Sequence, residues 1–268
     1  MLVDIEARVV ANRRLSPDYN VITLEAPEIA AAAAPGQFVM VKPGRGCDPL
    51  LRRPFSLFER LESNGRATGF SLLSKRIGVT TSMLFDAVEG DVISCLGPLG
   101  RPFDPIDSPG EAWMVAGGVG LAPFATLADA LAVRGTPTTL FYGARSGTDL
   151  FYLDWFASRR VRLVLCTEDG SVGTKGRVTV ALEQELKQAA GANVVVYACG
   201  PEPMLEAVAR ITGRYGCRCQ VSVERVMGCG MGGCYSCVIP VRDGSAGQHY
   251  VRSCLAGPVF DGAEIVWE

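Results

Sequence analysis

The middle of the chain contains the run Trp113-Met114-Val115-Ala116-Gly117-Gly118-Val119-Gly120-Leu121-Ala122-Pro123, an apolar strand followed by a glycine-rich turn and a helix start. Gly117, Gly118 and Gly120 allow the backbone to approach a pyrophosphate, and the helix N-terminus offers free N–H groups and a positive dipole end. Pro123 suits the first helical turn, although it occupies the last glycine position of a G-x-G-x-x-G fingerprint. The run predicts a nucleotide-binding turn, with an ordinary structural glycine turn as the alternative.

The residues around this run alternate between apolar strands and helical stretches. This alternation is typical of a parallel sheet covered on both faces, and we place the α/β domain at residues 110–221. The predicted strands are Ala112–Ala116, Thr138–Tyr142, Val161–Leu165 and Asn193–Ala198, and the predicted helices are Pro123–Val133, Val178–Gln188 and Pro203–Arg214.

A second glycine-containing turn, Cys199-Gly200-Pro201, follows the last of these strands. Open α/β sheets bind ligands at the carboxyl ends of their strands, so Gly200 and Pro201 are predicted to face the same crevice as the first turn. Cys199 is our candidate catalytic residue beside a nicotinamide. The alternative for Cys199 is a core thiol that closes the strand.

Two acids, Glu168 and Asp169, follow the third predicted strand. Carboxylates near an adenosine ribose accept hydrogen bonds from its free hydroxyls and repel a 2′-phosphate, which favours NAD over NADP. Arg145, after the second strand, points weakly toward NADP.

The first hundred residues differ in texture, because short β-like runs are separated by Gly and Pro. They predict a small antiparallel barrel over residues 1–101, followed by a Pro-containing linker up to residue 110. Within the barrel, Arg53 could pair with a phosphate, Phe55 could stack on an aromatic ring and Ser56 could bond a flavin edge. A purely structural Arg-Pro pair is the alternative. The predicted strands are Ala7–Val10, Val21–Leu24, Gln37–Val41, Phe70–Leu73 and Asp91–Ser94.

Four cysteines near the C-terminus have the spacing C-x4-C-x2-C-x16-C; they are Cys229, Cys234, Cys237 and Cys254. Plant-type [2Fe–2S] sites use C-x4-C-x2-C with a distant fourth cysteine, so the spacing predicts such a cluster in a small domain at residues 222–268. A zinc site or a group of reduced core thiols is the alternative, although zinc sites usually show paired C-x2-C knuckles. Two strands are predicted here, at Cys237–Val241 and Glu264–Trp267.

Composition narrows the class of protein further. The single histidine among 268 residues excludes most His-based zinc and general-base chemistry, and a net charge of −2 indicates neither nucleic acid nor an anionic membrane as a partner. The early acids of Met1–Glu6 argue against a signal peptide, so we expect a cytoplasmic protein. The other thiols, Cys47, Cys95, Cys166, Cys217 and Cys219, are expected to be core residues.

Together, R-P-F-S at 53–56, G-G-V-G-x-A-P at 117–123, C-G-P at 199–201 and the plant-type cysteine spacing resemble the ferredoxin-reductase-like superfamily. Within it, the chain resembles the electron-transfer subunits of two-component, NAD-dependent dihydroorotate dehydrogenases. The most specific stretches are Ser222–Gly230 and Cys254–Phe260.

The resemblance implies three parts: an antiparallel FAD-binding β-barrel, a parallel-sheet NAD-binding domain and a [2Fe–2S] domain. It implies that FAD is lined by Arg53, Pro54, Phe55 and Ser56, passes beside Ser71, Leu72 and Leu73, and has its pyrophosphate held at the turn that contains Gly78, Thr80 and Thr81. Thr80 departs from the family pattern, which has glycine there, and Ala256 stands where an aspartate is usual.

The implied partner is an FMN-containing catalytic subunit that oxidises dihydroorotate in pyrimidine biosynthesis, joined in a heterotetramer with two copies of each chain. Electrons would pass from that partner through [2Fe–2S] and FAD to NAD⁺. A reductase subunit serving a hydrogenase or a bifurcating complex is an alternative with the same parts. A non-catalytic iron–sulfur sensor is an alternative of a different class, and it predicts cofactor binding without nicotinamide turnover.

Overall fold

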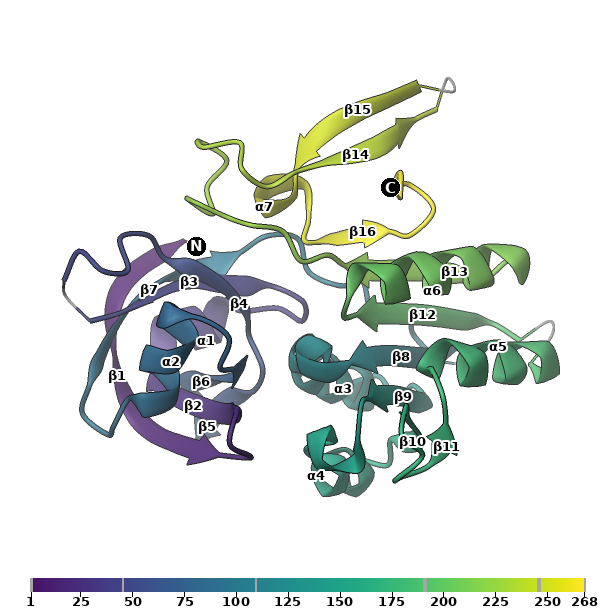
Figure 1. Ribbon diagram of the computed structural model, residues 1–268, viewed down its shortest axis with the longest axis horizontal. Coiled ribbons are helices and arrows are strands. Elements are labelled where there is room, and N and C mark those ends of the chain that lie inside the picture. Colours follow the sequence, from purple (N-terminus) through teal and green to yellow (C-terminus); the bar gives the residue numbers. More distant parts are fainter. Residues whose placement is uncertain (1, 45, 109, 190–191, 245–246, 268) are drawn as a thin grey trace.

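The computed structural model describes residues 2–44, 46–108, 110–189, 192–244 and 247–267. Figure 1 shows the N-terminal sheet beside the α/β region, with the C-terminal hairpin lying over the junction between them. Pro109 of the predicted linker and Met1 lie outside the described residues.

The N-terminal segment forms a seven-stranded antiparallel sheet in the order β4-β3-β7-β1-β2-β6-β5. Alternate apolar side chains of its strands fill one core, which includes Val39, Leu72 and Cys95. The predicted antiparallel barrel is confirmed as a half-barrel. Its elements are β1 (Val3–Arg14), β2 (Tyr19–Glu25), α1 (Pro27–Ala32), β3 (Phe38–Pro43), β4 (Arg53–Ser56), β5 (Arg60–Ser63), β6 (Arg66–Lys75), α2 (Val79–Asp86) and β7 (Val92–Leu99).

The second region is a sheet in the order β11-β10-β9-β8-β12-β13-β16, parallel except for β16. Apolar residues of α3 and α4 pack on one face and those of α5 and α6 on the other, which explains why the central strands are apolar on both sides. Its elements are β8 (Glu111–Gly117), α3 (Ala122–Val133), β9 (Thr138–Ala144), α4 (Leu153–Ser158), β10 (Arg162–Thr167), β11 (Thr174–Lys175), α5 (Val178–Gln188), β12 (Val194–Cys199), α6 (Glu202–Arg214) and β13 (Arg218–Ser222).

The C-terminal segment contributes a long loop and a two-stranded antiparallel hairpin. Its elements are β14 (Val238–Asp243), β15 (Gly247–Arg252), α7 (Ser253–Ala256) and β16 (Val259–Asp261). Because β16 pairs with β13, this segment also extends the α/β sheet at its edge.

The predicted strand at Glu264–Trp267 is wrong. Glu264 lies in a turn in which its N–H donates to the Asp261 carbonyl at 3.0 Å, and Ile265 makes only an isolated bridge to Val241. Ile265 is buried and Trp267 half-buried against the α/β core, so the apolar alternation reflected loop residues docking on that core.

The three parts meet around Gly100, Arg101 and Pro258. The Arg101 N–H donates to the Gly257 carbonyl at 2.6 Å, and the Val223 N–H donates to the Pro258 carbonyl at 3.0 Å. A Cβ on Gly100 would lie 2.5 Å from Pro258 Cδ, so only glycine fits between the barrel and the C-terminal segment. None of the helices in the described part of the chain combines the length and the apolar character that crossing a membrane requires.

Candidate cofactor and nucleotide sites

The two glycine turns of the α/β region pack directly on each other. β8 and β12 are parallel neighbours in which Ala116 pairs with Cys199, so the turns that follow begin side by side. A Cβ on Gly120 would lie 2.1 Å from the Cys199 carbonyl oxygen. Gly200, with φ near +155°, has Gly117 in contact. The predicted convergence of Gly117, Gly120 and Gly200 is therefore present.

Cys199 is half-buried and ends β12, directly before Gly200. Burial raises the pKa of its thiol to about 12, and the Ser222 side chain opposes that rise through a hydrogen bond. The thiol is therefore protonated at neutral pH and does not act as a thiolate nucleophile. Its chemistry suits packing against a flat ligand ring.

The acids Glu168 and Asp169 lie at the same sheet edge, but they follow β10, two strands away from β8. Both side chains are exposed. The Ser171 hydroxyl and N–H donate to Asp169 Oδ1 at 2.6 and 2.9 Å, and these bonds lower the pKa of Asp169. Asp169 is thus an anchored carboxylate, while Arg145 contacts it through backbone hydrogen bonding.

The predicted flavin strand is β4, at the open edge of the half-barrel. Arg53 is exposed and donates to the Leu51 and Arg52 carbonyls at 3.3 and 3.2 Å. Phe55 is half-buried against the barrel core, whereas Pro54 and Ser56, on alternate positions, face the other way. The strand leaves Arg53 and the outer face of Pro54 and Ser56 accessible to a ligand.

The neighbouring strand β6 contributes Ser71, Leu72 and Leu73, all buried. Leu72 belongs to the barrel core, and Leu73 joins the core that continues into the α/β region. Ser71 donates to Glu59 Oε2 at 3.0 Å. β6 also contacts the Gly118–Leu121 turn, so this strand and the nucleotide turn are neighbours.

The helix α2 begins at the predicted pyrophosphate turn. Thr81 Oγ1 accepts hydrogen bonds from the Ile77 and Gly78 N–H groups at 2.8 and 2.9 Å, which caps the helix. Thr80 lies in the first helical turn with its side chain buried. Threonine is therefore accommodated where the family pattern has glycine, because no positive φ is needed at this position.

The four predicted ligands come from a loop and a short helix. Cys229 and Cys234 lie in the loop between β13 and β14, Cys237 directly precedes β14, and Cys254 lies in α7. The Ser253 N–H donates to the Cys237 carbonyl at 2.9 Å, which holds Cys254 beside Cys237. The four thiols interact with one another: Cys229 acts on the pKa of Cys234, and Cys237 and Cys229 both act on the pKa of Cys254.

The four thiols have different surroundings. Cys237 and Cys254 are 1% exposed, and burial followed by the neighbouring Cys237 raises the pKa of Cys254 to about 12. Cys234 is exposed, and hydrogen bonds from Ser236 lower its pKa to about 6. Cys237 and Cys254 are therefore enclosed by the protein, whereas Cys229 is half-buried and Cys234 faces solvent.

Backbone N–H groups already point at Cys229. Met231 and Gly233 donate to Cys229 Sγ at 3.4 and 3.3 Å. Such donors stabilise cluster sulfurs and tune their potential. Within the described ranges, no three His, Cys, Asp or Glu side chains converge on a single-ion site. Four thiols fit two irons that each take two thiolates.

The other cysteines only partly match the prediction. Cys95, Cys166 and Cys219 are buried as expected. Cys47 is exposed and Cys217 half-buried, so the prediction that both are core residues is wrong. Cys47 lies in the loop between β3 and β4, where no core is available to cover it.

An apolar layer joins the cluster segment to the barrel. Phe38, Met40, Leu96 and Leu99 of β3 and β7 pack with Met227, Cys237 and Cys254. Met40 pairs with Pro54 in the β3–β4 ladder. A Cβ on Gly230, whose φ is +72°, would lie 2.6 Å from Met40 Cγ. The cluster loop therefore rests on the strand that borders the predicted flavin strand.

Sequence reasoning missed two features of this region. One is a cleft of about 770 Å³ between the barrel and the cluster loop, lined in part by Leu50, Leu51 and Met231. The other is an ion pair between Arg225 and Glu202, which joins the cluster segment to the start of α6. Both features join residues that are far apart in the chain, so no spacing in the sequence indicated them.

Family models match two parts of the chain. A model described as an oxidoreductase NAD-binding domain matches residues 114–210, and one described as the iron–sulfur cluster binding domain of dihydroorotate dehydrogenase B matches residues 224–266. With the half-barrel, these matches define a ferredoxin-reductase-like oxidoreductase that carries an iron–sulfur domain. The thiol spacing is thus assigned to iron–sulfur rather than zinc.

The full length of the chain specifies the family further. It is 37% identical over 262 residues to the dihydroorotate dehydrogenase B (NAD(+)) electron transfer subunit of Geobacillus thermodenitrificans, covering 96% of each chain. It is 34% identical to the same subunit of Desulforamulus reducens, covering 98% of each. The chain belongs to this family of electron transfer subunits.

Solved structures agree with the fold. An NADH-dependent reduced ferredoxin-NADP oxidoreductase, described in terms of flavin-based electron bifurcation, matches with a TM-score of 0.84 at 29% identity, over 97% of this chain and 90% of that one. A Neisseria gonorrhoeae ferredoxin NADP⁺ reductase with bound FAD and NADP matches with a TM-score of 0.66 at 18% identity, over 80% of this chain and 92% of that one. The cofactor prediction of FAD, [2Fe–2S] and NAD is confirmed at the level of the family.

Proposed function

We propose that this chain is the subunit that connects an FMN-containing dihydroorotate dehydrogenase catalytic subunit to NAD⁺ in pyrimidine biosynthesis. The [2Fe–2S] cluster supplies one-electron transfer, FAD supplies the conversion between single electrons and hydride, and the chain holds both. The observation that carries the proposal is the continuous contact from Cys237 and Cys254 through Met40 to Pro54.

The geometry above supports the following residue assignments. Cys229, Cys234, Cys237 and Cys254 are the proposed cluster ligands. Arg53, Pro54 and Ser56, with the backbone of Ser71–Leu73 and the α2 N-terminus at Gly78–Thr81, are proposed to hold FAD. Gly117, Gly118, Gly120, Gly200 and Pro201 are proposed to hold the NAD pyrophosphate and nicotinamide ribose, with Cys199 against the nicotinamide ring and Glu168 and Asp169 near the adenosine ribose.

The chain's own groups perform positioning rather than acid–base chemistry. The neutral Cys199 thiol packs against a planar ring without competing as a nucleophile, and the anchored Asp169 carboxylate favours free ribose hydroxyls. The buried pair Cys237 and Cys254 keeps one side of the cluster site dry. The acid or base for dihydroorotate is proposed to lie on the partner.

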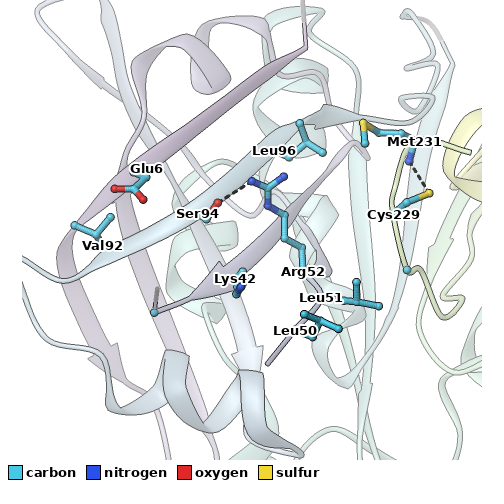
Figure 2. Close-up of a pocket in the computed structure, with 12 residues that line it drawn as sticks. Glu6, Lys42, Leu50, Leu51, Arg52, Val92, Ser94, Leu96, Cys229 and Met231 are labelled. Atoms are coloured by element: carbon cyan, nitrogen blue, oxygen red, sulfur yellow. Dashed lines mark hydrogen bonds between the residues drawn. The ribbon is translucent and has the colours of Figure 1, made fainter. Parts of the chain in front are cut away.

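The cleft beside Cys229 is the proposed docking surface for that partner, because the half-buried Cys229 lines it. Figure 2 shows Leu50 and Leu51 lying across the cleft from Met231 and Cys229. Leu50 and Met231 are 71% and 53% exposed, an apolar character typical of interface cores. Arg52 lies between these walls, bonded to Ser94 Oγ at 2.8 Å. The family resemblance supports a heterotetramer with two copies of each chain, which we propose to lie in the cytoplasm.

The first experiment is an anaerobic titration of the purified chain with NADH and then NADPH, followed by visible absorbance and EPR. We expect NADH to bleach a flavin band and to produce a reduced [2Fe–2S] signal at lower concentrations than NADPH. Adding a catalytic subunit with dihydroorotate should then reduce NAD⁺. If the cofactors are bound but neither NADH nor NADPH reduces them, the proposal is wrong and the iron–sulfur sensor alternative takes its place.

The docking surface is tested with matched lysine substitutions. Leu50→Lys and Met231→Lys should weaken the complex with the catalytic subunit about tenfold or more, because each places a charge in an apolar contact. The control is Val133→Lys, 89% exposed at the end of α3, which should leave affinity unchanged. Equal affinities for all three variants, measured by calorimetry, would place the partner elsewhere.

A further inference from the structure

The segment that leads from β13 into the cluster loop carries an arginine that reaches back to the nucleotide site. Arg225 Nη1 and Nη2 donate to Glu202 Oε2 and Oε1 at 2.5 and 2.9 Å, a two-pronged ion pair. Its side chain is 26% exposed and that of Glu202 45%. A fork-to-carboxylate pair of this kind fixes both orientation and charge.

Glu202 occupies a sensitive position. It is the first residue of α6 and follows Cys199-Gly200-Pro201 without a gap. Pro201 and Met204 contact the first glycine turn, since a Cβ on Gly117 would lie 2.9 Å from atoms of both residues. A carboxylate here comes directly after the turn that is proposed to hold a dinucleotide with a negative pyrophosphate. Unneutralised, it would repel that ligand and compete for the positive end of α6.

Arg225 neutralises this carboxylate from another part of the chain. It lies four residues before Cys229, and Met227, between them, is buried in the apolar layer against the barrel. The backbone on both sides of Arg225 is therefore fixed, by β13 before it and by the buried Met227 after it.

We propose that Arg225 is a positioning residue of the nucleotide site: it holds the Glu202 carboxylate neutralised and turned toward the cluster segment, so that the joined glycine turns accept a dinucleotide. The site is then built from two regions, because the cluster segment supplies the cation that pairs with Glu202. The inference rests on the proposed function, since it takes the two glycine turns as the NAD site.

The experiment measures NAD⁺ binding to the oxidised, cofactor-loaded protein by calorimetry for wild type, Arg225→Ala, Glu202→Gln and the double variant. Arg225→Ala should raise Kd about fivefold, because it leaves a carboxylate uncompensated directly after the turn that is proposed to hold the ligand. Glu202→Gln should change Kd by less than about twofold, since it removes both the charge and the need for neutralisation. The double variant should match Glu202→Gln.

Rescue by Glu202→Gln is the decisive readout, because a merely structural role of Arg225 would leave the double variant as weak as Arg225→Ala. Arg210→Ala is the matched control: it breaks the Arg210–Glu206 pair on the same helix and should leave Kd unchanged. The visible spectrum of the cluster verifies folding, and Arg225→Lys, which keeps the charge, should bind more tightly than Arg225→Ala.

Two results would overturn the inference alone: equal Kd values for all variants when the wild type binds NAD⁺, or a double variant that remains as weak as Arg225→Ala. A wild-type protein that does not bind NAD⁺ would overturn the proposed function and this inference together.

Discussion

The α/β region and the cluster segment position their functional groups in different ways. In the α/β region, the register between β8 and β12 brings two glycine turns together, and Gly120 packs directly on the backbone of Cys199. In the cluster segment, four thiols depend on a loop, a short helix and packing against β3 and β7 of another region. The paired strands of a parallel sheet hold the turns of a site in position by themselves. A short loop segment needs packing against other regions, and a bound group, to hold its side chains in position.

The largest expected effect comes from removing a ligand on the cluster side of this comparison. Cys237→Ser should abolish the [2Fe–2S] absorbance and EPR signal, because the cluster loses one thiolate. NADH reduction of the flavin should remain, since the sheet-built site does not depend on the cluster. Loss of iron, by mutation or chelation, should also lower the thermal stability of the C-terminal segment.

The matched control for this variant is Cys217→Ser, a half-buried thiol on the α/β edge that is not among the four proposed cluster ligands. It should keep the full cluster spectrum. A complete cluster signal in Cys237→Ser would mean that the ligand assignment is wrong.

The second effect tests the sheet side. Gly120→Ala should destabilise the protein by about 3 kcal/mol and abolish reduction by NADH, because the new Cβ would meet the backbone at Cys199, which cannot move aside. Urea unfolding and an NADH titration measure the two consequences. The cluster spectrum should survive, which is the mirror image of Cys237→Ser.

Gly213→Ala provides the control on α6, because its Cβ would meet no atom within 4 Å. It should be neutral or stabilising by up to about 1 kcal/mol, from helix propensity alone. Unfolding midpoints that coincide for Gly120→Ala and wild type would show that the two turns do not pack as closely as described.

The smallest expected effect concerns the ion pair between Arg225 and Glu202, which joins the cluster segment to the α/β region. Hydrogen bonds from Arg225 lower the pKa of Glu202 below its usual 4.5. A carboxyl whose folded-state pKa is depressed adds stability above its unfolded pKa and loses it as the pH falls. The difference in unfolding free energy between wild type and Glu202→Gln should therefore be under about 1 kcal/mol near pH 7, as for an exposed pair, and should shrink below pH 4.5.

Urea unfolding at several pH values between 3 and 7 measures this difference. Arg225→Ala and Glu202→Gln should each remove the same contribution of the ion pair to the pH dependence of the unfolding free energy. A difference that grows on acidification would reverse the sign and contradict the assigned pair.

Short local patterns in the sequence predicted several helices, the nucleotide-binding turns and the cluster cysteines. Glycine turns that follow apolar strands predict a nucleotide-binding turn, because only glycine lets two backbone segments approach so closely. Gly117, Gly120 and Gly200 lie at such close approaches. The C-x4-C-x2-C-x16-C spacing specified the cluster, because two irons need four thiolates at restricted separations. Helices α3, α5 and α6 were predicted to within one residue at each end, since their periodicity and proline starts are local signals.

Tertiary structure alone decided how these parts meet. The missed strand β16 owes its pairing to β13, and the wrong strand at Glu264–Trp267 owes its apolar residues to docking on the α/β core. The cleft beside Cys229, the layer around Met40 and the pair of Arg225 with Glu202 join residues distant in sequence. Such contacts depend on the packing of whole regions, which no local pattern encodes.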